Sequence, residues 1–239
     1  MPIKAILFDM FDTLMMIKKN HDFYSPSLMR MYKFLFGNGV NVPLEKFQEA
    51  YDKAREELYA VADPNLEEPH FNVRLALTLK KLGYSHDAYS PLVVSASSVF
   101  CDSFMTFVSL DEDAEPLLRS LYGKYKLGIV SNYAIPECLY ELLKTYNLNT
   151  LFDVVIVSGA VNKRKPSPEI FTKTLNVLEV TAAETVFVGD TFDADIEGPK
   201  AVGMKTVYIK RREEKQPKNI KPEATITSLA ELPKVLQKL

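Results

Sequence analysis

The sequence predicts an α/β fold in which a doubly wound parallel sheet is interrupted, after its first strand, by an all-helical insert. Two observations predict the sheet: short apolar runs that end at polar residues recur along the chain, and helical patterns separate the later runs. A third observation predicts the insert, because a long stretch near the N-terminus holds helical patterns without a convincing strand.

Five apolar runs have the length of a β-strand, and none of them alternates apolar with polar residues. Near-continuous apolar runs are typical of strands that are buried on both faces of a parallel sheet. The five predicted strands are IKAILF before Asp9, YKLGIV before Ser131, FDVVIV before Ser158, TVFV before Gly189-Asp190, and KTVYI before Lys210.

Helical patterns lie between these strands at residues 134–146, 167–178 and 194–203. Alternation of strand and helix indicates a parallel sheet with helices on both faces. In such a sheet the ligand lies outside the carboxyl ends of the strands. The polar residues that follow the strands are therefore the first candidates for chemistry.

The predicted insert spans residues 20–108 and contains the helical stretches LEKFQEAYDKAREELYAVA and HFNVRLALTLKKLG, separated by glycine and proline. We therefore expect two domains, a core domain of residues 1–19 and 109–239 and a helical cap domain of residues 20–108. Because the insert leaves the core just after Asp9, it starts at the ligand end of the sheet. It can act as a lid over the site.

Composition and charge are ordinary for a soluble globular protein and favour a small-molecule partner. The chain has 239 residues, 47% of them apolar and 25% charged, with 29 Lys and Arg against 31 Asp and Glu. A net charge of -2 gives no field that would attract nucleic acid or an anionic membrane, so neither partner is expected. The N-terminus MPIKAILFDM lacks the features of a signal peptide, so we expect a cytoplasmic protein. The sequence does not indicate an oligomeric state.

The two cysteines, Cys101 and Cys138, are far apart in the chain and form no CxxC pair. Neither a disulfide framework nor a zinc site is predicted from this spacing. We expect two reduced, buried thiols.

Polar residues at four predicted strand ends converge if the sheet is correct, and together they suggest phosphoryl transfer. An aspartate can attack phosphorus and form an aspartyl-phosphate. Mg²⁺ would hold the acidic residues and the substrate oxygens together without charge repulsion. A lysine, a hydroxyl and backbone N–H groups would hold the phosphoryl oxygens. The candidates are Asp9, Ser131, Asn132, Lys165, Asp190, Asp193 and Asp195.

Four motifs around these residues resemble those of the haloacid dehalogenase (HAD) superfamily of hydrolases, in the family's order. They are FDMFDTL, IVSN, KRKPSPEIF and VGDTFDADIEGPKAVGM, and the fourth is of the phosphatase type. The tail EATITSLAELPKVL resembles the family's closing strand and helix, and the helical insert resembles its C1-type cap. The resemblance implies a Rossmann-like core.

The resemblance also implies roles for the residues that handle the phosphoryl group. Asp9 matches the nucleophile, and Lys165 matches the lysine that orders nucleophile and phosphate. Ser131 matches the hydroxyl that binds the phosphoryl group, with the Asn132 amide nearby.

Magnesium is the cofactor that the resemblance implies. Asp9 and Asp190 match carboxylates that bind the ion, and the backbone carbonyl of Phe11 matches a further ligand. Asp195 matches the second acid of the fourth motif, which either binds the ion or supports a ligand. Asp193 has no counterpart, and a solvated or helix-capping role is the alternative for it.

Phe11 departs from the pattern of the family's phosphatases. Those enzymes have an aspartate two residues after the nucleophile, which protonates the leaving group and later activates water. Phe11 can do neither, and loss of a general acid-base typically costs 10² to 10⁴-fold in rate. Asp12 comes one place too late, so we expect it to hydrogen-bond within the turn. The sequence does not identify the group that replaces the missing general acid. His21, near the hinge between core and insert, is one candidate, and the alternative is that His21 is a surface histidine.

Two related families also lack that acid. The 2-haloacid dehalogenases usually have an aromatic residue there, but they need no metal and their fourth motif differs from Gly189-Asp190. The dehalogenases use a cap arginine to hold the substrate, so Arg30 is a candidate for contact with an anionic substrate. The alternative is that Arg30 lies on a solvated helix face. Phosphonatases use a cap lysine, yet the surroundings of Lys18 and Lys19 do not match theirs.

The leading hypothesis is a magnesium-dependent hydrolase of a small phosphorylated metabolite that acts through an aspartyl-phosphate on Asp9. Slow turnover and a preference for good leaving groups, such as acyl or aryl phosphates, follow from Phe11. The alternatives are a metal-independent 2-haloacid dehalogenase and a HAD-fold protein with little catalysis.

Overall fold

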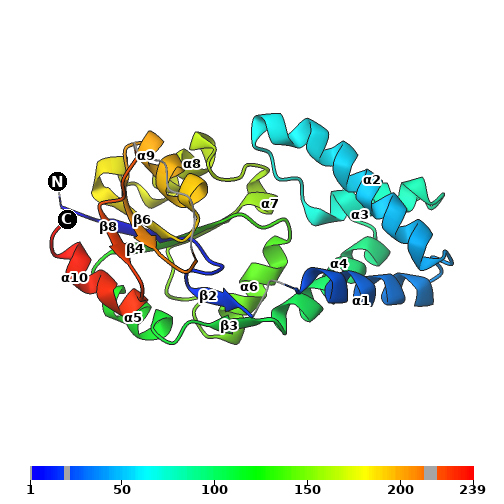
Figure 1. Ribbon diagram of the computed structural model, residues 1–239, viewed down its shortest axis with the longest axis horizontal. Coiled ribbons are helices and arrows are strands. Elements are labelled where there is room, and N and C mark those ends of the chain that lie inside the picture. The colour runs from blue at the N-terminus through cyan, green and yellow to red at the C-terminus, as the bar shows by residue number, and fades with distance from the viewer. Residues whose placement is uncertain (1, 19–21, 213–219) are drawn as a thin grey trace.

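A six-stranded parallel sheet forms the centre of the larger part of the protein (Figure 1). The computed structural model describes residues 2–18, 22–212 and 220–239. The strand order is β5-β4-β1-β6-β7-β8, and every neighbouring pair runs parallel. This arrangement confirms the predicted α/β fold class. The strands are β1 (Ala5–Phe8), β4 (Lys126–Ser131), β5 (Val154–Val157), β6 (Thr185–Gly189), β7 (Lys205–Ile209) and β8 (Ala224–Ile226).

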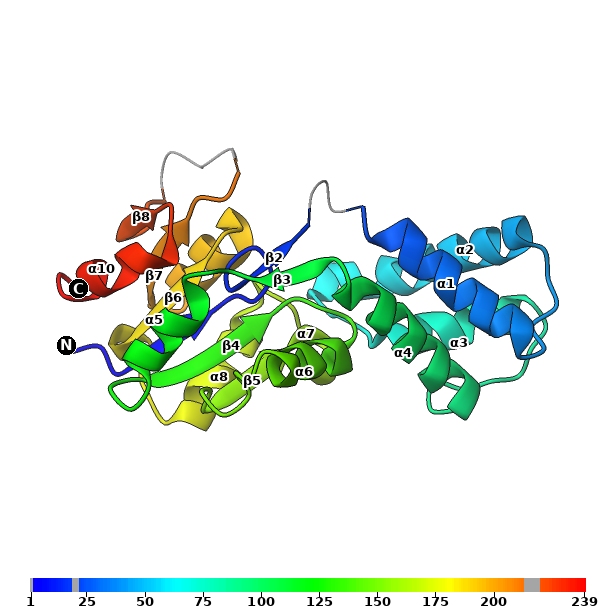
Figure 2. The ribbon, with the colours of Figure 1, turned by 90° about the horizontal axis from the view of Figure 1, so that it is seen from below.

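Helices bury both faces of the sheet, which explains why its strands are apolar throughout. Ile6 and Phe8 of β1 belong to the apolar cluster that includes α5 (Ala114–Leu121), α6 (Pro136–Thr145) and α10 (Leu232–Leu236). Ala5 and Leu7 face the opposite side, in the cluster formed with α8 (Pro168–Leu178). Figure 1 shows α8 on one side of the strands and α5, α6 and α10 on the other, and Figure 2 is seen from the side of α5, α6 and α10. The remaining short elements are η3 (Ala182–Glu184), α7 (Ser158–Val161) and η5 (Leu229–Glu231).

The helix predicted at residues 194–203 is two elements in the structure. A π-helical turn, η4 (Phe192–Glu197), is followed by α9 (Gly198–Ala201). Pro199 stands at the start of α9, and a proline has no N–H to donate to the preceding turn, so the regular helix starts anew there. π-Helical turns are rare overall, and those that occur often lie at functional sites.

Four helices form a separate unit at one end of the molecule, which we call the helical unit (Figure 1). They are α1 (Tyr24–Gly37), α2 (Leu44–Ala62), α3 (Phe71–Lys81) and α4 (Pro91–Met105), with a 3-10 turn η2 (Asp63–Asn65) after α2. In α2 the buried residues Phe47, Ala50, Tyr51 and Ala54 recur at helical spacing. One apolar cluster continues from the helical unit into the core beneath the sheet.

A two-stranded antiparallel ribbon that the sequence analysis did not predict connects the two parts. β2 (Met15–Ile17) leads toward the helical unit and β3 (Val108–Leu110) returns from it. Each strand has only three residues, which is too short for the period of a strand to be recognised.

The expectation of two reduced thiols is wrong. Cys101 of α4 and Cys138 of α6 form a disulfide, which ties the helical unit to a helix of the sheet. Both residues are buried, as expected. The packing of α4 against α6 brings the two thiols together, and no spacing rule reveals such a contact between distant cysteines.

The predicted residues around the hinge have different outcomes. His21 and Lys19 lie outside the described residues. Lys18 is exposed and donates a hydrogen bond to the carbonyl of Thr106 at 2.9 Å. Arg30 is exposed on α1, in agreement with the solvated alternative. None of the helices in the described ranges is both long and apolar enough to cross a membrane.

Candidate active site

The strand order brings three predicted site residues to one edge of the sheet. β1 lies between β4 and β6, so Asp9 after β1, Ser131 at the end of β4 and Asp190 after β6 are neighbours. This is the carboxyl edge at which ligands bind in open α/β sheets. A cavity of about 480 Å³ lies there. Its lining residues are Asp9, Phe11, Asp12, Ser131, Asn132, Lys165, Asp190, Thr191, Ala194, Asp195 and Arg212.

Lys165 joins two of the aspartates. Its buried Nζ lies 2.7 Å from Asp9 Oδ1 and 2.7 Å from Asp195 Oδ1. Burial alone would lower the pKa of Lys165, but the charges of Asp195 and Asp9 raise it above its ordinary value. The lysine therefore stays protonated between two carboxylates.

Asn132 fixes the backbone of that lysine. Its Oδ1 accepts a hydrogen bond from the N–H of Lys165 at 2.8 Å, and its Nδ2 donates to the carbonyl of Lys165 at 2.9 Å. The amide expected near the phosphoryl group is thus engaged with the lysine loop, although it also lines the cavity.

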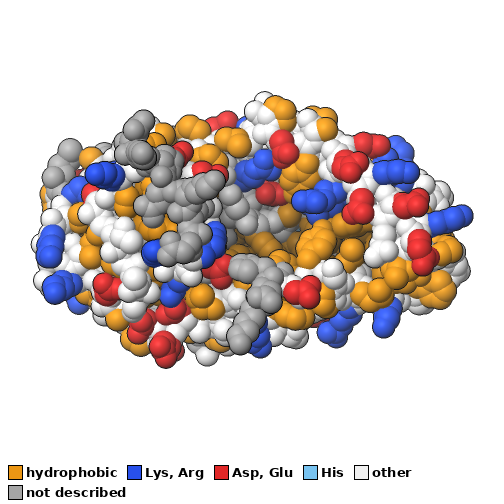
Figure 3. Space-filling view, viewed as in Figure 1, with side chains coloured by type: hydrophobic (Ala, Val, Ile, Leu, Met, Phe, Trp, Pro, Cys, Tyr) orange, Lys and Arg blue, Asp and Glu red, His pale blue; other side chains and the backbone are white. Residues whose placement is uncertain are grey.

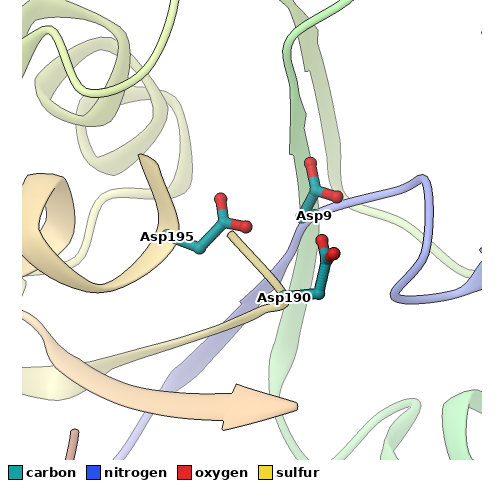
Figure 4. Close-up of side chains that lie close together, drawn as sticks. All are labelled: Asp9, Asp190 and Asp195. Atoms are coloured by element: carbon teal, nitrogen blue, oxygen red, sulfur yellow. The ribbon is translucent and has the colours of Figure 1, made fainter. Parts of the chain in front are cut away.

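Three carboxylates converge beside Lys165. One oxygen of each of Asp9, Asp190 and Asp195 lies within 4.8 Å of the others, and all three residues are buried. Figure 4 shows the three carboxylates turned toward a common space at the strand ends. Oxygen donors of this kind suit a hard cation such as Mg²⁺, so the residues present fit the expected metal.

The pKa values of this cluster reflect its burial first and its neighbouring negative charges second. Burial raises the pKa of Asp9 to about 6, with Lys165 opposing the rise and Asp195 adding to it. Burial and then the charges of Asp9 and Asp195 raise the pKa of Asp190 to about 7, while Arg212 opposes the rise. Both shifts have the direction expected for carboxylates that share a site.

The position of Asp195 depends on a glycine. A Cβ atom at Gly189 would clash with the carboxylate of Asp195, so that carboxylate can pack over β6 only where a side chain is missing. The N–H of Thr191 donates to Asp195 Oδ2 at 3.0 Å. The π-helical turn η4 holds Asp195 in this place.

Arg212 is a site residue that the sequence analysis missed. Its Nη1 lies 2.6 Å from Asp190 Oδ2 and 3.7 Å from Asp12 Oδ2, and its Nη2 donates to Thr191 Oγ1 at 3.0 Å. It comes from the segment after β7, outside the four motifs, so no pattern in the sequence indicated it. The guanidinium is half-exposed and neutralises one side of the carboxylate cluster.

Ser131 has a buried hydroxyl without a hydrogen-bond partner in the described part of the chain. A buried polar atom without a partner costs free energy. Ser131 lines the cavity together with Asp9, so its hydroxyl is a candidate donor to an oxygen atom of a ligand.

The ring of Phe11 connects the cavity to the helical unit. It lies 5.4 Å from the ring of Phe104 on α4 and 5.1 Å from the ring of Tyr133, centroid to centroid. Edge and tilted contacts at these distances are favourable for aromatic pairs. Phe11 is half-buried and forms part of the cavity wall.

The two remaining acids have local roles. Asp12 has a left-handed backbone, with φ of 55°, and its Oδ1 accepts from the N–H of Ile17 at 3.2 Å. The donor belongs to β2, so the hydrogen bond predicted within the turn reaches beyond it. Asp193 is exposed, and its Oδ1 accepts from the N–H of Ala194 at 2.8 Å. It does not line the cavity of Asp9.

Comparison with known proteins gives relatives along nearly the whole chain. A family model described as haloacid dehalogenase-like hydrolase matches residues 3–203. Glyceraldehyde 3-phosphate phosphatase of Methanopyrus kandleri is 31% identical over 217 residues, which cover 87% of this chain and 84% of that protein. N-acylneuraminate-9-phosphatase of Homo sapiens is 31% identical over 134 residues, which cover 55% of this chain and 54% of that protein.

Solved structures agree on the fold. A 2-haloacid dehalogenase from Pseudomonas syringae has a TM-score of 0.77 and 23% identity, with 99% of each chain covered. A HAD phosphatase from Thermococcus onnurineus has a TM-score of 0.60 and 26% identity, with 98% of each chain covered. The first of these likenesses shows the fold alone. The family model and the 31% identical relative go further: this chain belongs to the haloacid dehalogenase-like hydrolase family.

Proposed function

We propose that this hydrolase is a magnesium-dependent phosphatase that transfers the phosphoryl group of a small phosphate ester to Asp9 and then to water. The observation that carries the proposal is the convergence of Asp9, Asp190 and Asp195 beside Lys165, whose Nζ is 2.7 Å from Asp9 Oδ1. The phosphatase names of the relatives give it independent support.

In the first step Asp9 attacks the phosphorus atom. Lys165 and Asp9 Oδ1 are already hydrogen-bonded, which leaves Oδ2 to form the new bond to phosphorus. The bond from phosphorus to the ester oxygen breaks, and the leaving group departs with its electron pair. The free hydroxyl of Ser131 and the ammonium of Lys165 hold the phosphoryl oxygens.

Magnesium would be held by Asp9 and Asp190, with the backbone carbonyl of Phe11 as the further predicted ligand. When bound, the ion supplies positive charge that allows carboxylates and phosphoryl oxygens to approach one another. Asp195 already accepts hydrogen bonds at both oxygens, from Lys165 and from the N–H of Thr191. We therefore assign Asp195 mainly to the positioning of Lys165.

In the second step water attacks the phosphorus atom, the bond between phosphorus and Asp9 breaks, and phosphate leaves. No carboxylate stands at position 11 to take the proton of that water or to protonate the leaving group. Turnover is therefore slow, and substrates whose leaving group needs no proton, such as aryl phosphate esters and acyl phosphates, are favoured.

We also propose that the helical unit is a cap over this site, within the predicted boundaries of residues 20–108, with residues 1–19 and 109–239 as the core. The cavity of Asp9 opens between the carboxyl edge of the sheet and Phe11, whose ring contacts α4. A small phosphorylated metabolite fits the cavity volume of about 480 Å³. The cytoplasmic location predicted from the sequence also remains a proposal.

The test is phosphate release from 4-nitrophenyl phosphate with Mg²⁺ and with a chelator. We expect release by the wild type that depends on the metal, no release by Asp9→Asn, and a phosphorylated peptide containing Asp9 in acid-quenched samples. Asp193→Asn is the matched control, because Asp193 is exposed and outside the cavity. Metal-independent release, or full activity in Asp9→Asn, would refute the proposal.

One observation favours a second candidate, a 2-haloacid dehalogenase. An aromatic ring, Phe11, occupies the cavity wall where a phosphatase of this family has an acid. The carboxylates of Asp190 and Asp195 disfavour it, because they would repel the carboxylate of a haloacid. Release of halide from 2-chloropropionate in the presence of a chelator would establish the dehalogenase.

A further inference from the structure

A second cavity, of about 400 Å³, adjoins the cavity of Asp9 on the side of the helical unit. Asn132 lines both cavities, and the ring of Phe11 in the first lies 5.1 Å from that of Tyr133 in the second. Aromatic residues of α1, α2, α3 and α4 form much of its wall. Figure 3 shows a hollow between the two parts of the molecule, with hydrophobic side chains in its floor and basic side chains beside it.

The charged residues of this second cavity are mostly basic. Arg55, Arg74 and Arg164 line it, with Glu68 as the one lining carboxylate among the described residues. Arg164 is paired with Asp63 at 2.7 Å. Arg55 is exposed and makes no hydrogen bond or ion pair within the residues that the structure describes. The cavity therefore has an excess of positive charge that favours an anion.

Arg74 is buried with its charge only partly matched. Its Nη1 donates to the hydroxyls of Tyr24 and Tyr51, each at 3.1 Å, and its Nη2 donates to that of Tyr59 at 2.9 Å. No carboxylate of the described chain pairs with it directly, and Glu68 is reached only through the hydroxyl of Tyr59. Its Nε has no partner within the described residues. Because Glu68 acts on the guanidinium only at a distance, a direct anionic partner for this buried cation is favoured.

Tyr133 provides a second donor without a partner. Its hydroxyl is buried and unpaired within the described residues, although the side chain lines the same cavity as Arg74. A phenol hydroxyl carries its proton at neutral pH, so this group can donate a hydrogen bond to an oxygen atom of a ligand. Arg74 and Tyr133 both line this cavity, and each has one buried donor without a partner among the described residues. Two such donors can serve the two oxygens of a carboxylate.

We propose that the second cavity binds a carboxylate at the far end of the substrate, so that the substrates are phosphate monoesters that carry a carboxylate. The proposal rests on the proposed function, since the phosphoryl end lies in the adjoining cavity of Asp9. Arg74 and Tyr133 hold the carboxylate, Arg55 attracts it at the entrance, and the aromatic wall packs against the carbon atoms between the two ends.

The test compares aryl phosphates that differ only in charge at the far end. The acids are 4-carboxyphenyl, 4-(carboxymethyl)phenyl and 4-(2-carboxyethyl)phenyl phosphate, and the control for each is its primary amide. The series varies the distance between the phosphoryl group and the carboxylate while it keeps a good leaving group. We expect at least one acid to exceed its amide in kcat/KM by about tenfold or more, through a lower KM. If every acid and its amide agree within about twofold, the proposal is overturned.

The variants separate recognition from folding. Tyr133→Phe keeps the ring and removes only the hydroxyl, and we expect it to lower kcat/KM for the acid by about tenfold more than for the matching amide. Arg55→Gln, at an exposed position, should reduce that advantage by about threefold. Arg30→Gln is the matched control, because Arg30 is exposed on α1 and does not line the cavity. Equal effects on acid and amide would overturn the assignment.

A binding measurement distinguishes failure of this inference from failure of the proposed function. The phosphonates that match the acids and amides are not hydrolysed, so calorimetry with Mg²⁺ reports recognition alone. Tighter binding of the acids without turnover of any ester supports the cavity and refutes the phosphatase. Turnover of the esters with equal binding of acids and amides supports the phosphatase and refutes the cavity.

Discussion

Replacement of Phe11 by aspartate should raise phosphatase turnover at a cost in stability. The aspartate would stand two residues after Asp9, where it can protonate the leaving group and activate water, and such a group typically contributes 10² to 10⁴-fold. Phe11 lines the cavity of Asp9, so a carboxylate at this position would lie in the wall of the cavity that holds Asp9.

The cost follows from the contacts of the ring. Its contacts with Phe104 at 5.4 Å and Tyr133 at 5.1 Å are each worth about 0.5–1.5 kcal/mol. Loss of the burial of a half-exposed ring adds about 1 kcal/mol. We therefore expect Phe11→Asp to lower the free energy of unfolding by about 2–4 kcal/mol.

Phe11→Asn is the control that separates the two effects. It removes the same ring and leaves a side chain of nearly the same shape, but asparagine cannot transfer the proton. The assay is steady-state phosphate release from an alkyl phosphate, such as glycerol 3-phosphate, and from 4-nitrophenyl phosphate, with stability measured by urea denaturation. We expect Phe11→Asp to exceed Phe11→Asn by at least about 10²-fold on the alkyl ester and by less on the aryl ester. Equal rates for the two variants on both esters would refute the assignment of the missing acid.

Three further predictions concern the lysine, the arginine and the disulfide. Lys165→Met should abolish turnover and lower the free energy of unfolding by about 3–5 kcal/mol in urea denaturation, because buried Asp9 and Asp195 lose their shared cation; unchanged stability contradicts it. Arg212→Gln should tighten Mg²⁺ binding by about threefold in calorimetry, since the half-exposed guanidinium competes for Asp190; weaker binding contradicts it. Reduction of the Cys101–Cys138 bond, whose ends are 37 residues apart, should lower the free energy of unfolding by up to about 4 kcal/mol, and Cys101→Ser/Cys138→Ser should not respond to dithiothreitol.

The sheet and the polar edge of its strands could be predicted from the sequence because both depend on local patterns. Strands such as β1 and β6 are buried on both faces, so their apolar runs are continuous and end where the ligand edge begins. Asp9, Ser131 and Asp190 stand at those ends, and strand order alone makes them neighbours. The helix α2 is equally local, since its buried residues repeat with the period of a helix.

The remaining features depend on contacts between distant segments, for which a single sequence carries no signal. Arg212 reaches Asp190 from the segment after β7, and Cys101 reaches Cys138 because α4 packs against α6. A disulfide is unusual in a reducing cytoplasm, so this bond disagrees with the cytoplasmic location that the sequence predicts. Cell fractionation, with the redox state of Cys101 and Cys138 measured in each fraction, tests both the bond and the predicted location.

The aromatic contacts of Phe11 give a reason for a phenylalanine at a position where phosphatases of the family have an aspartate. The ring stands in the wall of the cavity of Asp9, and it packs against Tyr133 in the wall of the second cavity and against Phe104 of the helical unit. An aspartate could make neither aromatic contact. Phe11 therefore links the proposed site of phosphoryl transfer to the proposed site of substrate recognition, at the expense of the proton transfer that an aspartate provides. The proposed slow turnover and the proposed recognition of a carboxylate would then both depend on this one side chain. Phe11→Asp should raise the turnover rate while it weakens the preference of the enzyme for acids over amides.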